Sequence, residues 1–82
     1  MLQPNLTGVE ALDNLQLRLC YETGEVKLFD VRPYLVGSWY GVLEDEAYFK
    51  SVTLLEGGGG IQWPDGQDIA PHELYELSIP LA

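Results

Sequence analysis

The sequence predicts an α+β domain built on a curled antiparallel sheet of about four or five short strands, with two or three short helices against one face. Apolar and polar residues alternate from 15 to 21, which is typical of a half-buried strand. Near the C-terminus, apolar residues recur at helical spacing after Pro71, a residue that suits the first turn of a helix. Strands early in the chain and a helix late in it favour the α+β class.

The length of the chain favours a single domain over residues 1–82. Of its 82 residues, 46% are apolar. A chain of this size buries only about 60% of the surface that its unfolded form exposes, so its stability is expected to be marginal. Association of two copies would bury more surface, and a homodimer is therefore one hypothesis.

The first part of the chain predicts strands. Residues 1–8 are interpreted as an irregular lead-in, followed by a short strand over 9–12. The strand over 15–21 leads into a turn at Thr23 and Gly24, and a second strand returns over 26–30.

The register of this predicted hairpin depends on the length of its turn. A two-residue turn places Tyr21 opposite Val26 and Leu19 opposite Leu28, so that both strands bury the same side. It also places Phe29 on the polar face. An exposed phenylalanine there requires cover, from a helix or from a second chain.

The remaining elements are short. Asp30 is expected to cap a helical turn over 31–35, and a short helix is expected over 43–49. Strands are predicted over 52–55 and 61–63, joined by a flexible connector of four glycines at 57–60. A turn at 64–66 follows, and then the final helix, with Asp68 or Ala70 before it and Pro80 at its end.

Charge restricts the classes of partner. Thirteen acidic residues against four basic ones give a net charge of −9. Direct nucleic-acid binding is disfavoured, because it depends on Lys and Arg at the phosphates, and an anionic membrane surface is disfavoured for the same reason. Residues 51–82 carry five acidic groups and no Lys or Arg, so the C-terminal third is the more acidic. A basic protein partner fits this charge.

Cysteine content and the N-terminus favour the cytoplasm. The single cysteine, Cys20, cannot form an intramolecular disulfide, and there is no Cys/His set for structural zinc. The first residues lack the basic and apolar regions of a signal peptide, and no apolar run approaches the length of a membrane span. We therefore expect a cytoplasmic protein.

The segment from Trp63 to Glu73 is the best candidate for chemistry. Asp65, Asp68, His72 and Glu73 could bind a divalent metal or share acid and base roles. A structural interpretation is favoured, because Asp65 suits a turn, Asp68 an N-cap and Glu73 a first helical turn. His72 is the only histidine, and no nucleophile motif accompanies it. No catalytic residue, metal or cofactor is therefore predicted.

Three further positions allow two interpretations. Cys20 is expected beside Arg18 and across from Lys27, where two cations would make it reactive, although a covered small residue is favoured. Trp39 and Tyr40 lie between glycines and are either exposed anchors of an interface or, as favoured, core residues.

Residues 63–75 contain the run Trp-Pro-x-Gly-x-Asp-x-x-Pro-x-x-Leu-Tyr, formed by Trp63, Pro64, Gly66, Asp68, Pro71, Leu74 and Tyr75. This run is the most specific part of a pattern of motifs that resembles a bacterial family catalogued as domain of unknown function 2442. The likeness covers nearly the whole chain. It implies an α+β domain with no assigned activity, whose relatives look like companions of a second small protein encoded beside them, as in toxin–antitoxin pairs. It also suggests that this run, with Asp65, defines a signature corner of the fold.

The leading hypothesis is a non-enzymatic protein-interaction module, the antitoxin-like partner of a small basic protein encoded nearby. Its acidic surface would steer the partner, and exposed aromatic residues would anchor it. One alternative is a small enzyme or a ligand- or metal-binding domain that uses the segment from Trp63 to Glu73. Another is a homodimer that buries the face carrying Phe29 and Cys20.

Overall fold

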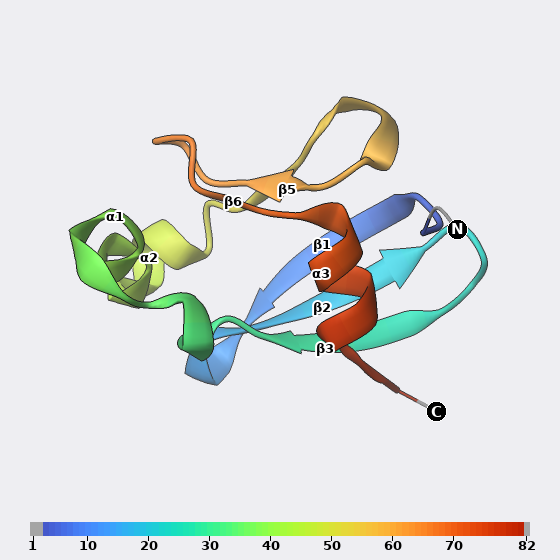
Figure 1. The fold of residues 1–82 in the computed structure, drawn as a ribbon, viewed down its shortest axis with the longest axis horizontal. Helices are drawn as coiled ribbons and strands as arrows, with labels where there is room; N and C mark the ends of the chain where they lie inside the picture. Colours follow the sequence, from blue (N-terminus) through green and yellow to red (C-terminus); the bar gives the residue numbers. More distant parts are fainter. Residues whose placement is uncertain (1–2, 82) are drawn as a thin grey trace.

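Two antiparallel sheets form the framework of the protein, seen in a computed structural model that describes residues 3–81 (Figure 1). The larger sheet has the strand order β1-β2-β3-β7 and the smaller one the order β4-β5-β6. The strands of the larger sheet are β1 (Leu6–Leu12), β2 (Gln16–Tyr21), β3 (Val26–Asp30) and β7 (Ile79–Pro80). Those of the smaller sheet are β4 (Thr53–Leu54), β5 (Ile61–Gln62) and β6 (Asp68–Ile69).

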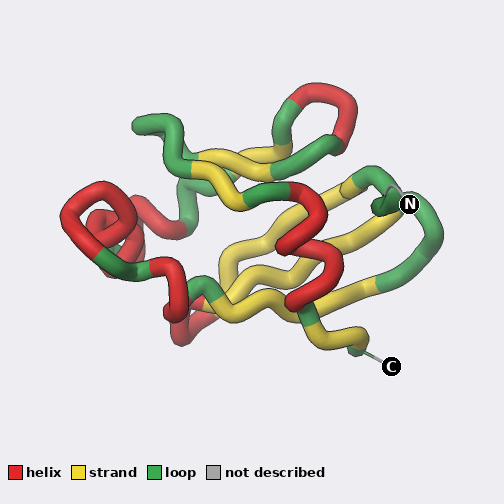
Figure 2. Tube along the Cα trace, in the orientation of Figure 1, coloured by secondary structure: helices red, strands yellow, loops and turns green. Residues whose placement is uncertain are grey.

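Short helices lie between and beside the sheets (Figure 2). The α-helices of the described residues are α1 (Gly37–Gly41), α2 (Glu46–Phe49) and α3 (Pro71–Leu77). The 3-10 turns are η1 (Asp13–Leu15), η2 (Arg32–Tyr34), η3 (Val42–Glu44) and η4 (Glu56–Gly58). The predicted α+β class, with its last helix near the C-terminus, is confirmed, and the strands divide between two sheets. No helix within residues 3–81 has the length and apolar character that a membrane crossing requires.

The first strand begins earlier than the sequence indicates. The lead-in predicted over 1–8 is wrong from Leu6 onward, because Leu6 is buried and pairs with Tyr21 in β2. The register shifts between Leu6 and Gly8, so the strand accommodates one extra residue as a bulge. The backbone amide of Glu22 donates to the carbonyl of Asn5 at 2.9 Å, which extends the pairing. Residues 1–2 of the predicted lead-in lie outside the described part.

The turn between β2 and β3 has three residues, so the predicted two-residue turn is wrong. Gly24 donates from its amide to the carbonyl of Tyr21, and the amide of Tyr21 donates to the carbonyl of Glu25, each at 2.9 Å. Gly24 has φ 93°, a left-handed conformation that glycine adopts without strain. A three-residue loop that ends in a left-handed glycine is a common hairpin turn.

The extra turn residue exchanges the two faces of β3. Leu19 lies opposite Lys27 and Leu17 opposite Phe29, one position away from the predicted register. A shift of one residue turns every side chain to the other face. Phe29 is therefore a core residue, only 1% exposed, and it needs no second chain to cover it.

The predicted buried face of β2 is confirmed at Leu17, Leu19 and Tyr21. The strand begins one residue later than expected, because Leu15 lies in η1 with φ 58°. The core continues from β2 to residues of the helices and the small sheet. Those with at most 2% exposure include Phe29, Val31, Leu43, Phe49, Ile61, Trp63 and Leu74.

The segment between the sheets follows the predictions in part. Asp30 accepts a hydrogen bond from the amide of Arg32 at 3.0 Å, but the N-cap residue of η2 is Val31 and no side chain caps this turn, so the interpretation of Asp30 as its cap is wrong. The helix expected over 43–49 is divided into η3 and α2, because Asp45 is extended (φ −71°, ψ 116°) and caps α2 through the amide of Tyr48. The glycine connector forms a hydrogen-bonded turn, in which the amide of Leu55 donates to the carbonyl of Gly60 at 2.8 Å.

The helix α3 begins without a side-chain cap. Its N-cap residue is Ala70, one of the two predicted, whereas Asp68 lies in β6, so the interpretation of Asp68 as an N-cap is wrong. Two residues separate Asp68 from the helix, which is too far for an N-cap residue. The helix ends at Leu77, before Pro80, because Ser78 is extended and the chain then pairs with β3 as β7.

A polar and aromatic cluster fastens α3 to the larger sheet. Lys27 is buried; its Nζ hydrogen-bonds the carbonyl of Tyr75 and lies 4.0 Å from the centre of the Tyr75 ring. The Tyr75 hydroxyl donates to the Glu25 carboxylate at 2.9 Å, and the ring meets that of Tyr21 edge to face at 5.1 Å. Glu25, the residue that follows the turn, thus connects the hairpin to the helix.

Candidate binding surfaces

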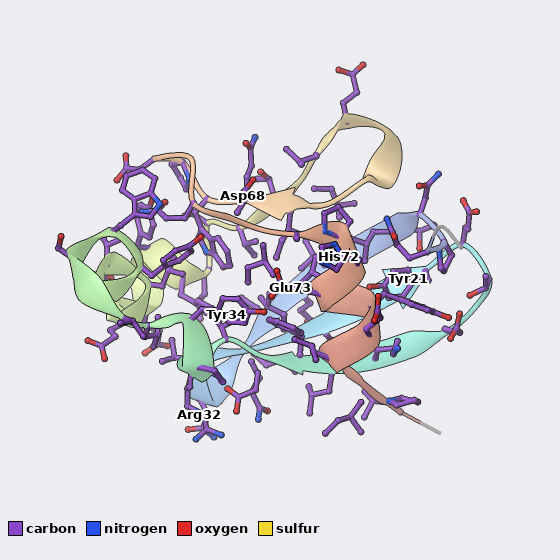
Figure 3. All side chains as sticks on the ribbon, in the orientation of Figure 1. Tyr21, Arg32, Tyr34, Asp68, His72 and Glu73 are labelled. Atoms are coloured by element: carbon purple, nitrogen blue, oxygen red, sulfur yellow. The ribbon has the colours of Figure 1, made fainter. Side chains whose placement is uncertain are left out.

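The candidate residues between Trp63 and Glu73 lie on different elements: Asp68 is on β6, whereas His72 and Glu73 are on α3 (Figure 3). Trp63 is in the core, and its Nε1 donates to the carbonyl of Phe49 at 2.9 Å. Asp65 and Asp68 are exposed, on the turn after β5 and on β6. His72 is exposed at the start of α3. Among residues 3–81, no three His, Cys, Asp or Glu side chains are grouped so that they could hold one metal ion.

The other residues of the signature run shape the corner between β5 and α3. The amide of Gly66 donates to the carbonyl of Trp63 at 2.9 Å, and Gly66 has φ 100°, which confirms the predicted turn. Gln67 follows; it is only 1% exposed and was not expected to be buried. Its Nε2 donates to the carbonyl of Trp39 at 2.9 Å, and its Oε1 accepts from the Tyr48 hydroxyl at 2.8 Å. The corner therefore holds α1 and α2 through one buried amide.

The aromatic pair Trp39 and Tyr40 lies in α1. Trp39 is 53% exposed, so the favoured interpretation of it as a core residue is wrong. Tyr40 is half-buried, and its hydroxyl donates to the carbonyl of Asp68 at 3.0 Å. The glycines at both ends of α1 do not indicate from the sequence that Trp39 is exposed and Tyr40 is half-buried.

Cys20 lies on the face of the larger sheet opposite to the core. It pairs with Gly8 on one side and Val26 on the other. The expectation that Lys27 lies across from it is wrong, because the register places Lys27 on the core face beside Tyr75. One of the two cations that would have activated the thiol is therefore directed away from it.

Each Lys and Arg side chain within residues 3–81 has a partner in the chain. Arg18 pairs with Glu10, and Lys27 bonds the carbonyl of Tyr75. Arg32 pairs with Asp30 at 2.8 Å and Lys50 with Glu46 at 2.9 Å. The exposed carboxylates outside these contacts are Asp13, Glu22, Glu44, Asp45, Glu56, Asp65, Asp68 and Glu76. The surface thus presents acidic groups that no cation of the chain neutralises by contact.

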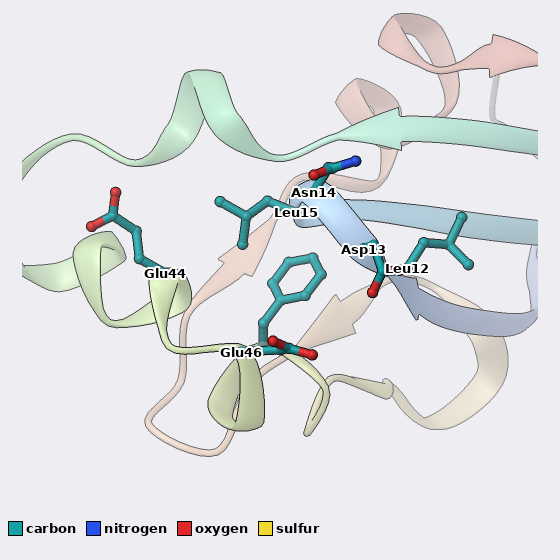
Figure 4. A pocket seen from close by; sticks show the side chains of 7 residues that line it. Leu12, Asp13, Asn14, Leu15, Glu44 and Glu46 are labelled. Carbon is teal, nitrogen blue, oxygen red and sulfur yellow. The ribbon is translucent and has the colours of Figure 1, made fainter.

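One hollow, of about 490 Å³, lies between η1 and the segment from η3 to α2 (Figure 4). The residues that give it charge are Asp13, Glu44 and Glu46, and those that give it apolar surface are Leu12, Leu15 and Phe49. Glu46 is paired with Lys50. We call this the acidic hollow.

A second hollow, of about 400 Å³, lies between η2 and α3, and we call it the Tyr34 groove. Its lining residues are Phe29, Asp30, Pro33, Tyr34, Glu73 and Leu77. The Tyr34 hydroxyl donates to Oε1 of Glu73 at 2.6 Å, and the Tyr34 ring lies 5.6 Å from that of Phe29. Sequence reasoning did not single out Tyr34 or Leu77. Leu77 matched the helical spacing of buried residues, but it is 62% exposed.

Contacts within the chain determine the protonation states of Tyr34 and Asp30, two residues that line the Tyr34 groove. Burial, together with the hydrogen bond to Glu73, raises the pKa of Tyr34 to about 12, so its hydroxyl remains a donor at neutral pH. The hydrogen bond from the Arg32 side chain lowers the pKa of Asp30, which is therefore ionised. The groove thus combines apolar walls with carboxylates.

These features define a small acidic α+β domain whose acidic hollow and Tyr34 groove are both bordered by carboxylates. The chain belongs to the family described as Protein of unknown function (DUF2442), whose model matches residues 6–80. The family resemblance found in the signature run is thereby confirmed. No curated protein and no solved structure matches the chain.

Proposed function

We propose that this domain is a non-enzymatic interaction module that binds a small basic protein in the cytoplasm, as the antitoxin-like member of a pair encoded by adjacent reading frames. The proposal rests on one observation, which is how many of the charged side chains have a partner of opposite charge within the chain. All four basic side chains are engaged within the chain, whereas eight exposed carboxylates have no cationic partner, namely Asp13, Glu22, Glu44, Asp45, Glu56, Asp65, Asp68 and Glu76.

This arrangement favours a cationic protein over other partners. Unpaired carboxylates attract Lys and Arg of an approaching protein and accelerate the encounter, and they repel phosphate groups. Trp39 offers an exposed aromatic ring of the kind that anchors interfaces. The alternative of an enzyme or a metal-binding domain receives less support, since Trp63 is in the core and Glu73 accepts from Tyr34.

Co-expression with the product of the neighbouring reading frame tests the proposal. We expect a complex that survives size-exclusion chromatography, and relief of any growth defect that the neighbour causes on its own. Salt should slow association, because the attraction is between exposed charges. The absence of a complex, together with unchanged toxicity, would refute the proposal.

A variant with fewer acidic side chains tests whether the C-terminal third of the chain attracts the basic partner. Changing Asp65 and Asp68 to Asn and Glu76 to Gln removes three exposed charges of the C-terminal third and should lower the association rate. The matched control is Thr53→Ala, an exposed change on β4 that leaves the charge unaltered, and it should bind as the wild type does.

A further inference from the structure

The Tyr34 groove differs from the acidic hollow in the extent of its apolar wall. Its apolar lining comes from Phe29 on β3, from Pro33 and Tyr34 on η2, and from Leu77 on α3. The Tyr34 ring is fixed in place by its hydrogen bond to Glu73 and its contact with Phe29. A wall that is held on both sides keeps its shape, and a preformed hollow loses less free energy on binding.

Leu77 stands exposed at the edge of the groove. It is the last residue of α3 and is 62% exposed, whereas Leu74, one turn earlier, is completely buried. A leucine beside a preformed apolar hollow provides contact area for an apolar side chain from outside. At about 400 Å³, the groove is near the lower end of the range for binding pockets, about 300–1,000 Å³, and it suits an anchoring side chain rather than a large ligand.

The charge around the groove determines the kind of molecule that brings this side chain. Asp30 and Glu73 lie on its border, and Glu76 is exposed on the same helix. Arg32 already pairs with Asp30, whereas Glu73 and Glu76 have no cationic partner, and every Lys and Arg within residues 3–81 is engaged elsewhere. A second copy of this chain also carries a charge of −9 and would be repelled. A segment with Lys or Arg beside its apolar residue is complementary both to the apolar lining of the groove and to the negative charge around it.

We propose that the Tyr34 groove receives an apolar side chain from a basic segment of a partner protein, with a Lys or Arg beside that residue facing Glu73. This rests on the proposed function and names the site at which the basic partner is anchored. Leu77 is the contact residue at the edge, and Tyr34 positions Glu73.

Peptide probes test the groove without knowledge of the partner. The first probe has leucines flanked by lysines, the second has serines in place of the leucines, and the third has glutamates in place of the lysines. Amide shifts in NMR spectra and fluorescence anisotropy give the site and the affinity. We expect the first probe to shift the amides of Phe29, Tyr34 and Leu77, the second to bind about tenfold more weakly, and the third not to bind.

Two exposed aliphatic residues supply a matched pair of variants. Leu77→Ser should weaken the first probe about tenfold, because it removes apolar contact at the groove. Ile79→Ser is the control: Ile79 is 66% exposed, similar to Leu77, but it lies on β7 outside the groove, and affinity should change less than about twofold. Glu73→Gln should weaken binding, whereas Glu76→Gln should have a smaller effect. Thermal unfolding verifies that each variant folds.

The outcomes separate this inference from the proposed function. Binding of the lysine probes at other amides, or equal binding by Leu77→Ser and Ile79→Ser, overturns the groove as the anchoring site, and a basic partner could still form the complex found by co-expression. Failure of every lysine probe to bind also overturns the inference. Failure of the co-expression test, with the groove binding the first probe, overturns the paired-protein function alone.

Discussion

The run of four glycines at 57–60 allows a test of the fold by stability measurements. Glycine is replaced by alanine at three neighbouring positions, and a different change in stability is expected at each. Gly59 has φ −79°, and a Cβ added there meets nothing within 4 Å. Gly57 has φ 83° and is equally open. Gly58 has φ 74°, and a Cβ there would lie 2.3 Å from the carbonyl oxygen of Leu6. The three positions thus differ in backbone conformation and in space.

The expected changes in the free energy of unfolding follow from these differences. Gly59→Ala should stabilise by about 0.4–1 kcal/mol, because it restricts the unfolded chain at a compatible backbone. Gly57→Ala should destabilise by about 1–2 kcal/mol, the cost of a left-handed conformation for an L-residue. Gly58→Ala carries the same strain and also displaces Leu6, whose backbone pairs with Tyr21; we expect a total loss of about 2–4 kcal/mol.

Urea denaturation followed by circular dichroism measures all three variants against the wild type. Each free energy of unfolding comes from linear extrapolation, with the slope verified to be unchanged. Stability should fall in the order Gly59→Ala, wild type, Gly57→Ala, Gly58→Ala. If Gly58→Ala were as stable as Gly57→Ala, the close approach of η4 to β1 would be incorrect. A loss of more than about 1 kcal/mol in Gly59→Ala would contradict its open, right-handed geometry.

Two further predictions concern the buried amide and the groove. Gln67→Leu leaves the Trp39 carbonyl and the Tyr48 hydroxyl without their partner, so we expect a loss of about 2–4 kcal/mol in urea denaturation, against less than about 0.5 kcal/mol for Gln62→Leu at an exposed position of β5. Similar losses in the two would contradict a structural role for Gln67. The pKa of Tyr34 is raised from 10.0 to about 12, so its contribution to stability is complete below pH 10 and is lost as the pH rises through 12. The urea midpoint of Tyr34→Phe should therefore decline less over this range than that of the wild type, and equal declines would refute the raised pKa of Tyr34.

Local patterns were sufficient to predict much of the fold. The alternation at 15–21 identified the buried face of β2, and Pro71 identified the start of α3, because both depend on neighbouring residues alone. The turn before Gln67 was also predicted, since Pro64, Asp65 and Gly66 favour it locally. These successes concern single elements and not the contacts between them.

The candidate site was less predictable, because its parts are far apart in the sequence. Tyr34 and Glu73 are 39 residues apart, and no spacing rule connects them. Leu77 has the helical spacing of a core residue, but whether it is covered depends on where η2 lies beside α3. Aspartate is a common N-cap residue, but Asp68 lies two positions before Ala70, which is the N-cap residue of α3.

The sequence by itself determined the family, the α+β class, the acidic character and the alternation of β2, all of which reside in composition or in neighbouring residues. Only the tertiary structure decided which face of β3 is buried. One extra residue in the turn at Glu22–Gly24 moves Phe29 into the core and Lys27 onto Tyr75, and the free-energy difference between turns of two and three residues depends on how the whole sheet packs. The same packing brings Tyr34 to Glu73 and leaves Leu77 exposed at the groove.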